Sequence, residues 1–298
     1  MNAWVVHQAR RTKPVKELTE VIKVSRPGFW PTQLWFYTLP LATVDCFGSP
    51  AFWLGCVYVQ FPLGLLLYGW NDLGDSATDR INARKDSWLF GATPDDALRR
   101  RLPVWIAAVQ VPFLSAFVWL LGWKVLPWAA ALLMVNYSYN NLGFKSRPVL
   151  DLLNQVGYLL IFVLASWLCG VPQLNGPAMI FSTLFAMQSH LFGQLMDIDA
   201  DRIAGRRSTA VTIGVRPAKG LLVAIMLAEV VIALRFFQSP IVAWFMAAGA
   251  VFFAVDAVLG PKRYPLWFTR GFFILWNVIV LVTMHWVWRY GLFMLAET

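Results

Sequence analysis

The chain has 298 residues, of which 58% are hydrophobic and only 14% are charged, and its formal net charge is +9. A soluble globular chain carries charge on about a quarter of its residues. A soluble core could not absorb this much apolar sequence, whereas a bilayer can, so the composition excludes an ordinary soluble domain. Allowing about 20 residues per span plus connections, it predicts one membrane bundle of roughly 8–10 helices.

The N-terminal segment is basic and polar and has no apolar stretch before Phe29. This pattern argues against a cleavable signal peptide. We interpret residues 1–28 as a cytoplasmic N-terminal segment, within which Val15–Val24 could form a short amphipathic helix on the membrane surface. Residues 29–298 are expected to form a single membrane-embedded domain.

Apolar stretches long enough for membrane helices recur along the rest of the chain. Nine are predicted, of which the fourth is the shortest: 29–47, 50–70, 103–121, 125–139, 152–171, 178–195, 220–237, 240–259 and 267–290. The expected fold class is therefore an all-α integral membrane protein with about nine transmembrane helices.

Lys and Arg are distributed unevenly between the connections. If the N-terminus is cytoplasmic, every Lys and Arg lies on the cytoplasmic side except Lys124, Arg235 and Arg289. Because cytoplasmic connections of membrane proteins are enriched in Lys and Arg, the asymmetry supports an odd number of spans. It predicts a cytoplasmic N-terminus, in a bacterial or archaeal inner or plasma membrane.

The connection after the second span begins with an Asp-rich motif, Asn71-Asp72-Leu-Gly-Asp75-Ser-Ala-Thr-Asp79-Arg80. On an α-helix, Asp72, Asp75 and Asp79 would share one narrow face. Carboxylates crowded together in this way need positive charge, and hard divalent cations with oxygen ligands supply it. One such motif alone could be a set of ordinary solvated charges.

A second motif, Asp197-Ile-Asp199-Ala-Asp201-Arg202, follows the sixth span and falls on the same side of the membrane. Asp197 and Asp201 are four residues apart and share a helix face, whereas Asp199 is expected to point elsewhere. Two matched motifs predict a shared metal and phosphate site.

Basic residues accompany both motifs, and a diphosphate needs such charge for binding and for departure as a leaving group. The basic candidates are Arg80, Arg84, Lys85, Lys145, Arg147, Arg202, Arg206 and Arg207. The cytoplasmic enrichment of Lys and Arg would place basic residues here without any ligand. His190 is interpreted first as an interior histidine whose hydrogen bonds are satisfied. Glu229 is interpreted first as an acid that has a structural partner within the bundle.

These residues resemble the UbiA superfamily of intramembrane prenyltransferases. Besides both Asp motifs, the resemblance includes the loop Tyr137-Ser-Tyr139-Asn-Asn-Leu-Gly-Phe-Lys145 and the tail Gly205-Arg-Arg-Ser-Thr209. It implies nine helices around a central cavity and metal ligation by the two motifs, with Mg²⁺ in two sites. The implied metal ligands, whose carboxylates are also the catalytic candidates, are Asn71, Asp72, Asp75, Asp79, Asp197 and Asp201.

The same resemblance implies a set of residues that bind the prenyl donor. The substrate-binding candidates are Asn71, Lys145, Arg26, Arg80, Arg202, Tyr137 and Tyr139. The stretches Ser25–Trp30 and Ala186–Gly214 are similar to carotenoid-type members such as lycopene elongases. Leu67 stands where many aromatic prenyltransferases have Arg, which argues against an aromatic acceptor.

The expected reaction is Mg²⁺-dependent transfer of a prenyl group from an isoprenoid diphosphate to a lipophilic acceptor, through an allylic carbocation. One alternative is a UbiA-type terpene cyclase, in which a double bond of the donor attacks its own cation. A more remote alternative is a membrane transporter, although transporters more usually place polar or broken helices at mid-bilayer. The expected partners are the donor, the acceptor and the bilayer, and no nucleic acid.

Overall fold

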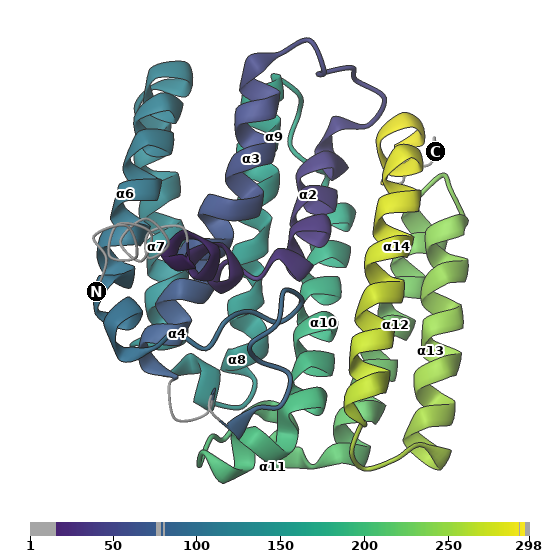
Figure 1. Cartoon of the computed structure of the whole chain (residues 1–298). Helices are drawn as coiled ribbons and strands as arrows, with labels where there is room; N and C mark the ends of the chain where they lie inside the picture. Colours follow the sequence, from purple (N-terminus) through teal and green to yellow (C-terminus); the bar gives the residue numbers. More distant parts are fainter. Residues whose placement is uncertain (1–15, 76–78, 80, 292, 296–298) are drawn as a thin grey trace, which may run out of the picture.

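Long helices stand roughly parallel to one another in the computed structural model of the chain, and a short helix, α11, lies across one end of the bundle (Figure 1). The structure describes residues 16–75, 79, 81–291 and 293–295. Among these residues no β-strand is formed, and only two isolated β-bridges occur. The predicted all-α class is confirmed.

The helices follow the predicted apolar stretches closely. In chain order they are α2 (Trp30–Thr38), α3 (Pro50–Gly64), α4 (Trp70–Gly74), α6 (Asp96–Leu121), α7 (Val125–Asn140), α8 (Leu150–Leu153), α9 (Leu159–Cys169), α10 (Gly176–Ile203), α11 (Thr209–Ile213), α12 (Val215–Phe236), α13 (Ile241–Leu259) and α14 (Leu266–Tyr290). A π-helical turn over Leu65–Gly69 joins α3 to α4, and a 3-10 turn over Asn154–Tyr158 joins α8 to α9.

Six helical stretches of the described chain are long and apolar enough to cross a membrane. One of them, Asp96–Ser146, contains both α6 and α7, whereas α2 is too short and α10 is not apolar enough to be among the six. Large apolar side chains such as Trp119, Trp244 and Leu259 are more than two-thirds exposed on the outside of the bundle, as expected for a lipid-facing surface. The count of nine spans stays a prediction.

Two helix ends differ from the sequence prediction. The first predicted span, 29–47, is helical only to Leu41, because α2 ends at Thr38 and a 3-10 turn at Leu39–Leu41 follows. The sixth, 178–195, is longer than predicted, since α10 continues to Ile203. The second Asp motif is therefore part of the last two turns of α10 rather than of a loop.

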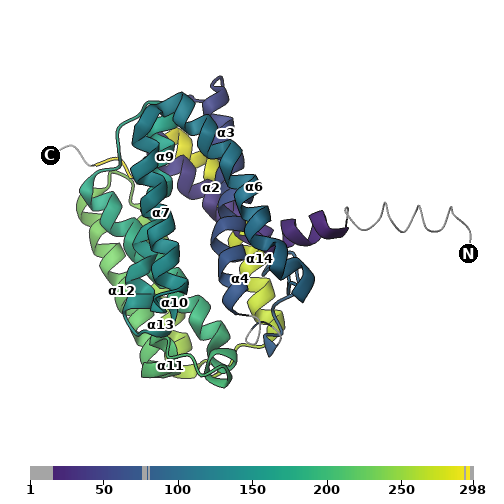
Figure 2. The same ribbon diagram turned by 90° about the vertical axis from the view of Figure 1, so that its left-hand side faces the viewer.

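Residues 16–24 form a helix, as predicted, and Figure 2 shows it lying roughly perpendicular to the long helices. Part of its apolar face packs against the bundle, while Leu18 is exposed. Val21 and Val24 are fully buried against Leu65, Leu98 and Leu102. The helix is therefore fastened to the bundle by packing, and it leads directly to Arg26, which precedes the 3-10 turn Pro27–Phe29 before α2.

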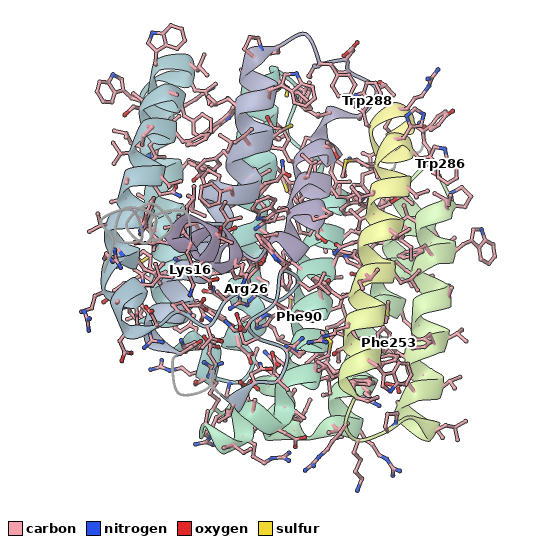
Figure 3. All side chains as sticks on the ribbon, viewed as in Figure 1. Lys16, Arg26, Phe90, Phe253, Trp286 and Trp288 are labelled. Carbon is pink, nitrogen blue, oxygen red and sulfur yellow. The ribbon has the colours of Figure 1, made fainter. Side chains whose placement is uncertain are left out.

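Aromatic side chains fill both the interior and the rim of the bundle. Trp286 and Trp288 lie at one end of α14, and Phe253 lies toward the other end of the molecule (Figure 3). Half-exposed Trp286 fits the role of an interfacial anchor. Phe253, by contrast, is buried and packs against Phe192, with ring centroids 5.1 Å apart.

Candidate active site

A cavity of about 750 Å³ lies between the helices, and residues from both Asp motifs line it. The charged and amide side chains at its mouth come mainly from the ends of α4 and α10 and from the segments that follow them: Asn71, Asp75, Asp79, Asn82, Arg84, Lys85, Asp197, Asp201 and Arg206. Its aromatic lining comes from within the helices and includes Phe29, Phe36, Phe185, Phe253, Phe273 and Trp276. The cavity thus combines a charged mouth with an apolar chamber.

The carboxylates of the first motif do not share one helix face, so that expectation is wrong. Helix α4 ends at Gly74, and Asp75 has left the helical conformation with φ −103° and ψ 13°. The motif therefore divides into two groups. Asp72 and Asp79 both contact Lys85, at 2.9 and 3.1 Å, and Asp72 also contacts Arg26 at 3.2 Å.

Asp75 forms the other group, with two cations from distant parts of the chain. Lys145 Nζ lies 2.6 Å from Asp75 Oδ1, and Arg206 Nη2 lies 2.5 Å from the same oxygen. Burial acts to raise the pKa of Asp75, but the charges of Arg206 and Lys145 outweigh it and hold that pKa below its usual value. Asp75 is therefore ionised across the physiological range.

The second motif binds cations of its own. Arg84 holds Asp197 through two contacts, one of them 2.9 Å from Nε to Oδ1, and Asn82 Nδ2 donates to the same oxygen at 2.8 Å. Arg206 Nη1 lies 3.1 Å from Asp201 Oδ1. Burial raises the pKa of Asp201 to about 6 and outweighs the opposing charge of Arg206.

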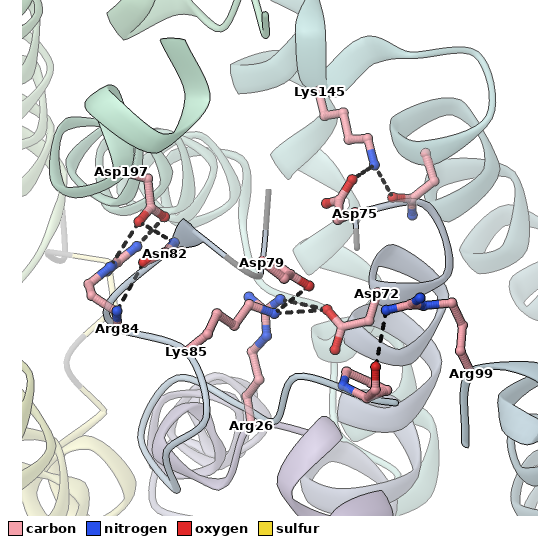
Figure 4. A network of polar contacts seen from close by, with 12 residues as sticks. Arg26, Asp72, Asp75, Asp79, Asn82, Arg84, Lys85, Arg99, Lys145 and Asp197 are labelled. Carbon is pink, nitrogen blue, oxygen red and sulfur yellow. Dashed lines mark hydrogen bonds and ion pairs between the residues drawn. The ribbon is translucent and has the colours of Figure 1, made fainter. Parts of the chain in front are cut away.

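Two arginines join the motifs to each other, as Figure 4 shows for Arg84. Arg84 follows the first motif and reaches Asp197 of the second. Arg206 follows the second motif and reaches Asp75 of the first, as well as Asp201. Residues more than 110 positions apart in the chain are thereby held around one mouth, as the matched motifs predicted.

Several predicted residues lie at or beside this mouth. Asn71, Arg26 and Tyr139 line the cavity, and Tyr139 Oη lies 3.4 Å from His190 Nε2. Asp72 and Lys145 lie directly behind the lining, where they contact Arg26 and Asp75. The expectation that Asp199 points away agrees with the structure, because Asp199 pairs with Arg263 at 2.8 Å outside the cavity.

Two predicted substrate-binding residues are not found at the mouth, and a third cannot be placed because it is not among the described residues. Tyr137 is 43% exposed and does not line the cavity, because it is two positions from Tyr139 on α7 and faces away. Arg202 is also exposed and points toward Asp199, at 3.8 Å, since α10 is still helical there and turns it outward. Arg80 lies outside the described residues.

Besides Arg26, the cations that line the mouth are others from the same basic runs: Arg84, Lys85 and Arg206. Sequence spacing alone could not select them, because they follow the points at which helices α4 and α10 end. Once a helix ends, helical phase no longer predicts where a side chain points. The only available signal was their proximity to the Asp motifs.

Comparison with known proteins agrees with the site. The sequence model of the UbiA prenyltransferase family matches residues 30–278. The chain belongs to the UbiA prenyltransferase family. A lycopene elongase/hydratase of Corynebacterium glutamicum is 26% identical over 253 residues, covering 82% of this chain and 85% of that protein. A lycopene elongase/hydratase of Haloferax volcanii is 31% identical, covering 82% of this chain and 75% of that protein.

Solved structures show the same fold. A UbiA homologue from Archaeoglobus fulgidus, bound to DMAPP and Mg²⁺, superposes with a TM-score of 0.71 over 90% of this chain and 99% of that one, at 16% identity. The same homologue bound to GPP and Mg²⁺ gives a TM-score of 0.67. This chain is thus an integral membrane prenyltransferase with the UbiA fold.

The residues at the mouth of this prenyltransferase suit Mg²⁺. Carboxylate oxygens are its preferred protein ligands, usually one or two of them together with substrate phosphates. Asp72 Oδ2 is buried and has no hydrogen-bond partner, so its lone pairs remain for a cation. No group of three or more His, Cys, Asp or Glu side chains in the described chain is close enough to hold a metal. The donor set therefore fits an ion that shares its coordination with a diphosphate.

A buried network behind the mouth positions the segment that carries Arg206. Asp151 accepts hydrogen bonds from Thr209 N at 2.6 Å, from Thr209 Oγ1 at 2.5 Å and from Gln194 Nε2 at 2.7 Å. Gln194 in turn accepts from Ala210 N at 3.0 Å. This network ties α8, α10 and α11 together, and it fixes Thr209, the last residue of the tail Gly205–Thr209.

Proposed function

We propose that this prenyltransferase transfers the prenyl group of an isoprenoid diphosphate to a lipophilic acceptor, in a reaction that requires Mg²⁺. The observation that carries the proposal is the cavity, whose mouth gathers cations and carboxylates while its chamber is aromatic. A diphosphate head matches the mouth, and a prenyl tail matches the chamber. The A. fulgidus homologue was solved with DMAPP or GPP together with Mg²⁺, which supports this choice of donor and metal.

The acceptor we propose is an acyclic carotenoid of the lycopene type. Support comes from two relatives, both lycopene elongases/hydratases, that align with most of the length of this chain. An aromatic lining suits a polyene hydrocarbon, because it offers apolar contact without requiring polar groups on the ligand. Relatives of this kind extend their acceptor, so the acceptor's double bond is the proposed nucleophile.

Binding of the donor uses the residues of the mouth. Arg26, Arg84, Lys85 and Arg206 offer charge-assisted hydrogen bonds to the diphosphate oxygens, with Lys145 behind them. Asn71, Asp72, Asp75, Asp79, Asp197 and Asp201 are the proposed ligands of Mg²⁺, in two sites. When bound, Mg²⁺ would neutralise the diphosphate and make it a better leaving group.

After ionisation, residues of the chain stabilise the allylic carbocation and the released diphosphate. The allylic C–O bond breaks, and its electron pair departs with the diphosphate, whose added charge the arginines and lysines stabilise. The aromatic faces of the chamber stabilise the allylic cation and exclude bulk water. Attack by the acceptor's double bond forms the new C–C bond. We further propose that the mouth faces the cytoplasm, as the distribution of Lys and Arg indicates.

The test is a product analysis with purified protein in lipid nanodiscs. DMAPP and GPP are each supplied with Mg²⁺, with and without lycopene. We expect a prenylated carotenoid only when donor and acceptor are both present. Cyclic products from the donor alone would identify a terpene cyclase instead. Failure to release diphosphate from any donor would overturn the proposal altogether.

A further inference from the structure

Gln33 is a polar side chain in an otherwise aromatic part of the cavity. It lies on α2 and lines the cavity together with Phe29 and Phe36, which are four residues before it and three residues after it. At this spacing the three side chains share one helix face. Phe29 packs against Phe273 with ring centroids 4.7 Å apart, and Phe36 packs against Phe185 at 5.9 Å. An amide therefore stands between two aromatic clusters.

The Gln33 amide has no partner in the described chain. It is only 1% exposed, and neither its Oε1 nor its Nε2 has a hydrogen bond. A buried polar group without a partner costs about 1–3 kcal/mol. Among the described lining residues beyond the charged mouth, it is the one with both polar atoms buried and unpaired. Such an amide is expected to bind a ligand atom or a water molecule.

The position of Gln33 separates it from the diphosphate site. Arg26 marks the mouth by its 3.2 Å contact with Asp72, and Gln33 lies seven residues further along the chain. The four residues from Phe29 to Gln33 correspond to a rise of about 6 Å along a helix axis. The amide is thus placed beside the hydrocarbon part of the ligands rather than beside the diphosphate.

A hydrocarbon acceptor cannot form a hydrogen bond with this amide. Water is therefore the expected hydrogen-bond partner. One water molecule takes up about 30 Å³ and needs two to four polar partners, which a cavity of about 750 Å³ can provide. The amide has one acceptor and two donors. Thr32 also lines the cavity, and its hydroxyl accepts from Trp276 Nε1 at 2.9 Å while keeping its own hydrogen to donate.

We propose that Gln33 holds a water molecule in the chamber and that this water captures the carbocation formed on the acceptor. The inference rests on the function proposed above and identifies a positioning residue for its last step. When the acceptor's double bond has formed the C–C bond, a carbocation remains on the acceptor. A lone pair of the water forms a C–O bond to it, and the excess proton passes to the released diphosphate. The product is an alcohol, and without the water, proton loss gives an alkene.

The experiment compares Gln33→Met with a matched control, Gln110→Met. Gln110 is also buried, but it does not line the cavity and both ends of its amide are paired, with Pro62 O at 2.7 Å and Tyr58 Oη at 3.0 Å. Each protein is incubated with DMAPP, Mg²⁺ and lycopene in H₂¹⁸O. Mass spectrometry gives the ratio of ¹⁸O-labelled alcohol to alkene, and thermal unfolding gives Tm.

We expect Gln33→Met to lower the alcohol-to-alkene ratio by about tenfold, as for the loss of one good hydrogen bond. Its Tm should not fall, because no protein partner is lost. Gln110→Met should keep the wild-type ratio and lower Tm by about 4 °C, since Tyr58 and Pro62 lose their partner.

Three results would overturn the inference while leaving the proposed transfer intact. They are a wild-type product that is alkene alone, an unchanged ratio in Gln33→Met, and a loss of rate without a change of ratio. A fall in Tm for Gln33→Met equal to that of Gln110→Met would also overturn it, because it would show that the amide has protein partners. Absence of any transfer in the wild type would instead refute the proposed function, and the Tm comparison would still test the unpaired amide.

Discussion

Arg206 is the cation that the two Asp motifs share, since it contacts Asp75 at 2.5 Å and Asp201 at 3.1 Å. Burial acts to lower its pKa, but the charges of Asp75 and Asp201 outweigh burial and raise that pKa, so it stays charged. Among the described carboxylates, Lys145 contacts only Asp75. Arg206 shares that carboxylate with Lys145.

We therefore predict that Arg206→Gln lowers kcat/KM for the donor by about 10²–10³, the usual effect of losing one preorganised charge stabiliser. Lys145→Ala should cost only about tenfold, because Arg206 still holds Asp75. Steady-state kinetics with GPP as the varied substrate would measure both. Exposed Arg207 is the matched control for Arg206, and Lys124 is the control for Lys145. Equal losses in Arg206→Gln and Arg207→Gln would contradict the prediction.

Asp197 and Asp199 provide a second comparison, because they lie two residues apart on the same helix. Asp197 lines the cavity and is held by Arg84, whereas Asp199 lies outside it and pairs with Arg263. We expect Asp197→Asn to reduce turnover by more than about 10²-fold, because it would remove a proposed ligand of the Mg²⁺ that stabilises the leaving diphosphate. Asp199→Asn should retain turnover within about twofold, as for loss of an exposed ion pair. Turnover assays at saturating Mg²⁺ decide between them, and similar losses in both variants would refute the inward assignment of Asp197.

At the scale of the helices, the sequence predicted the parts that depend on periodicity. The apolar stretches located the long helices, and the spacing within α10 correctly separated Asp197 from Asp199. It could not predict that α4 ends at Gly74, because no proline or strong capping pattern marks that point. Helical phase turns Arg202 outward on α10, whereas Arg84 and Arg206 follow the ends of α4 and α10 and reach the mouth. Side chains beyond a helix end are oriented by tertiary contacts, here by the carboxylates of the other motif.

Close packing at Gly28 positions the segment that carries Arg84 and Lys85. A Cβ added at Gly28 would lie 2.4 Å from Leu89 O, a backbone atom, and Gly28 N donates to Trp88 O at 3.1 Å. The turn at residues 87–91 therefore rests directly on the 3-10 turn Pro27–Phe29 that precedes α2. A larger side chain at position 28 must push this backbone away, and Arg84 and Lys85, which precede the turn, must move with it.

Gly28→Ala is accordingly expected to lower thermal stability by about 1–3 kcal/mol, the usual cost of overpacking. It should also lower kcat/KM, because Arg84 and Lys85 move away from Asp197 and Asp72. Gly48 is the matched control, because an added Cβ there meets nothing within 4 Å. Thermal unfolding and donor kinetics of both variants make the comparison. Wild-type behaviour of Gly28→Ala would show that the turn is not held by this contact.

For the whole molecule, the charges of the mouth are balanced by the chain itself. Asp72, Asp75, Asp79, Asp197 and Asp201 each contact at least one Lys or Arg. Leaving a buried charge unpaired would cost several kcal/mol, and these pairs avoid that cost. Folding therefore does not need a metal to compensate the carboxylates, unlike a small zinc domain in which metal binding drives folding.

Metal removal should consequently separate stability from activity. We predict that excess EDTA abolishes diphosphate release while changing Tm by no more than about 2 °C, which corresponds to less than about 1 kcal/mol. Added Mg²⁺ should restore activity.

Mg²⁺ alone should stabilise the protein little, because its coordination is completed by phosphate oxygens. Mg²⁺ together with a non-hydrolysable prenyl diphosphate analogue at 100 times its Kd should add about 2.7 kcal/mol to the free energy of unfolding. Differential scanning fluorimetry in detergent, paired with a diphosphate-release assay, measures both quantities. Full turnover in EDTA would refute the metal requirement, and a large fall in Tm would show that the metal rather than Lys and Arg holds the mouth together.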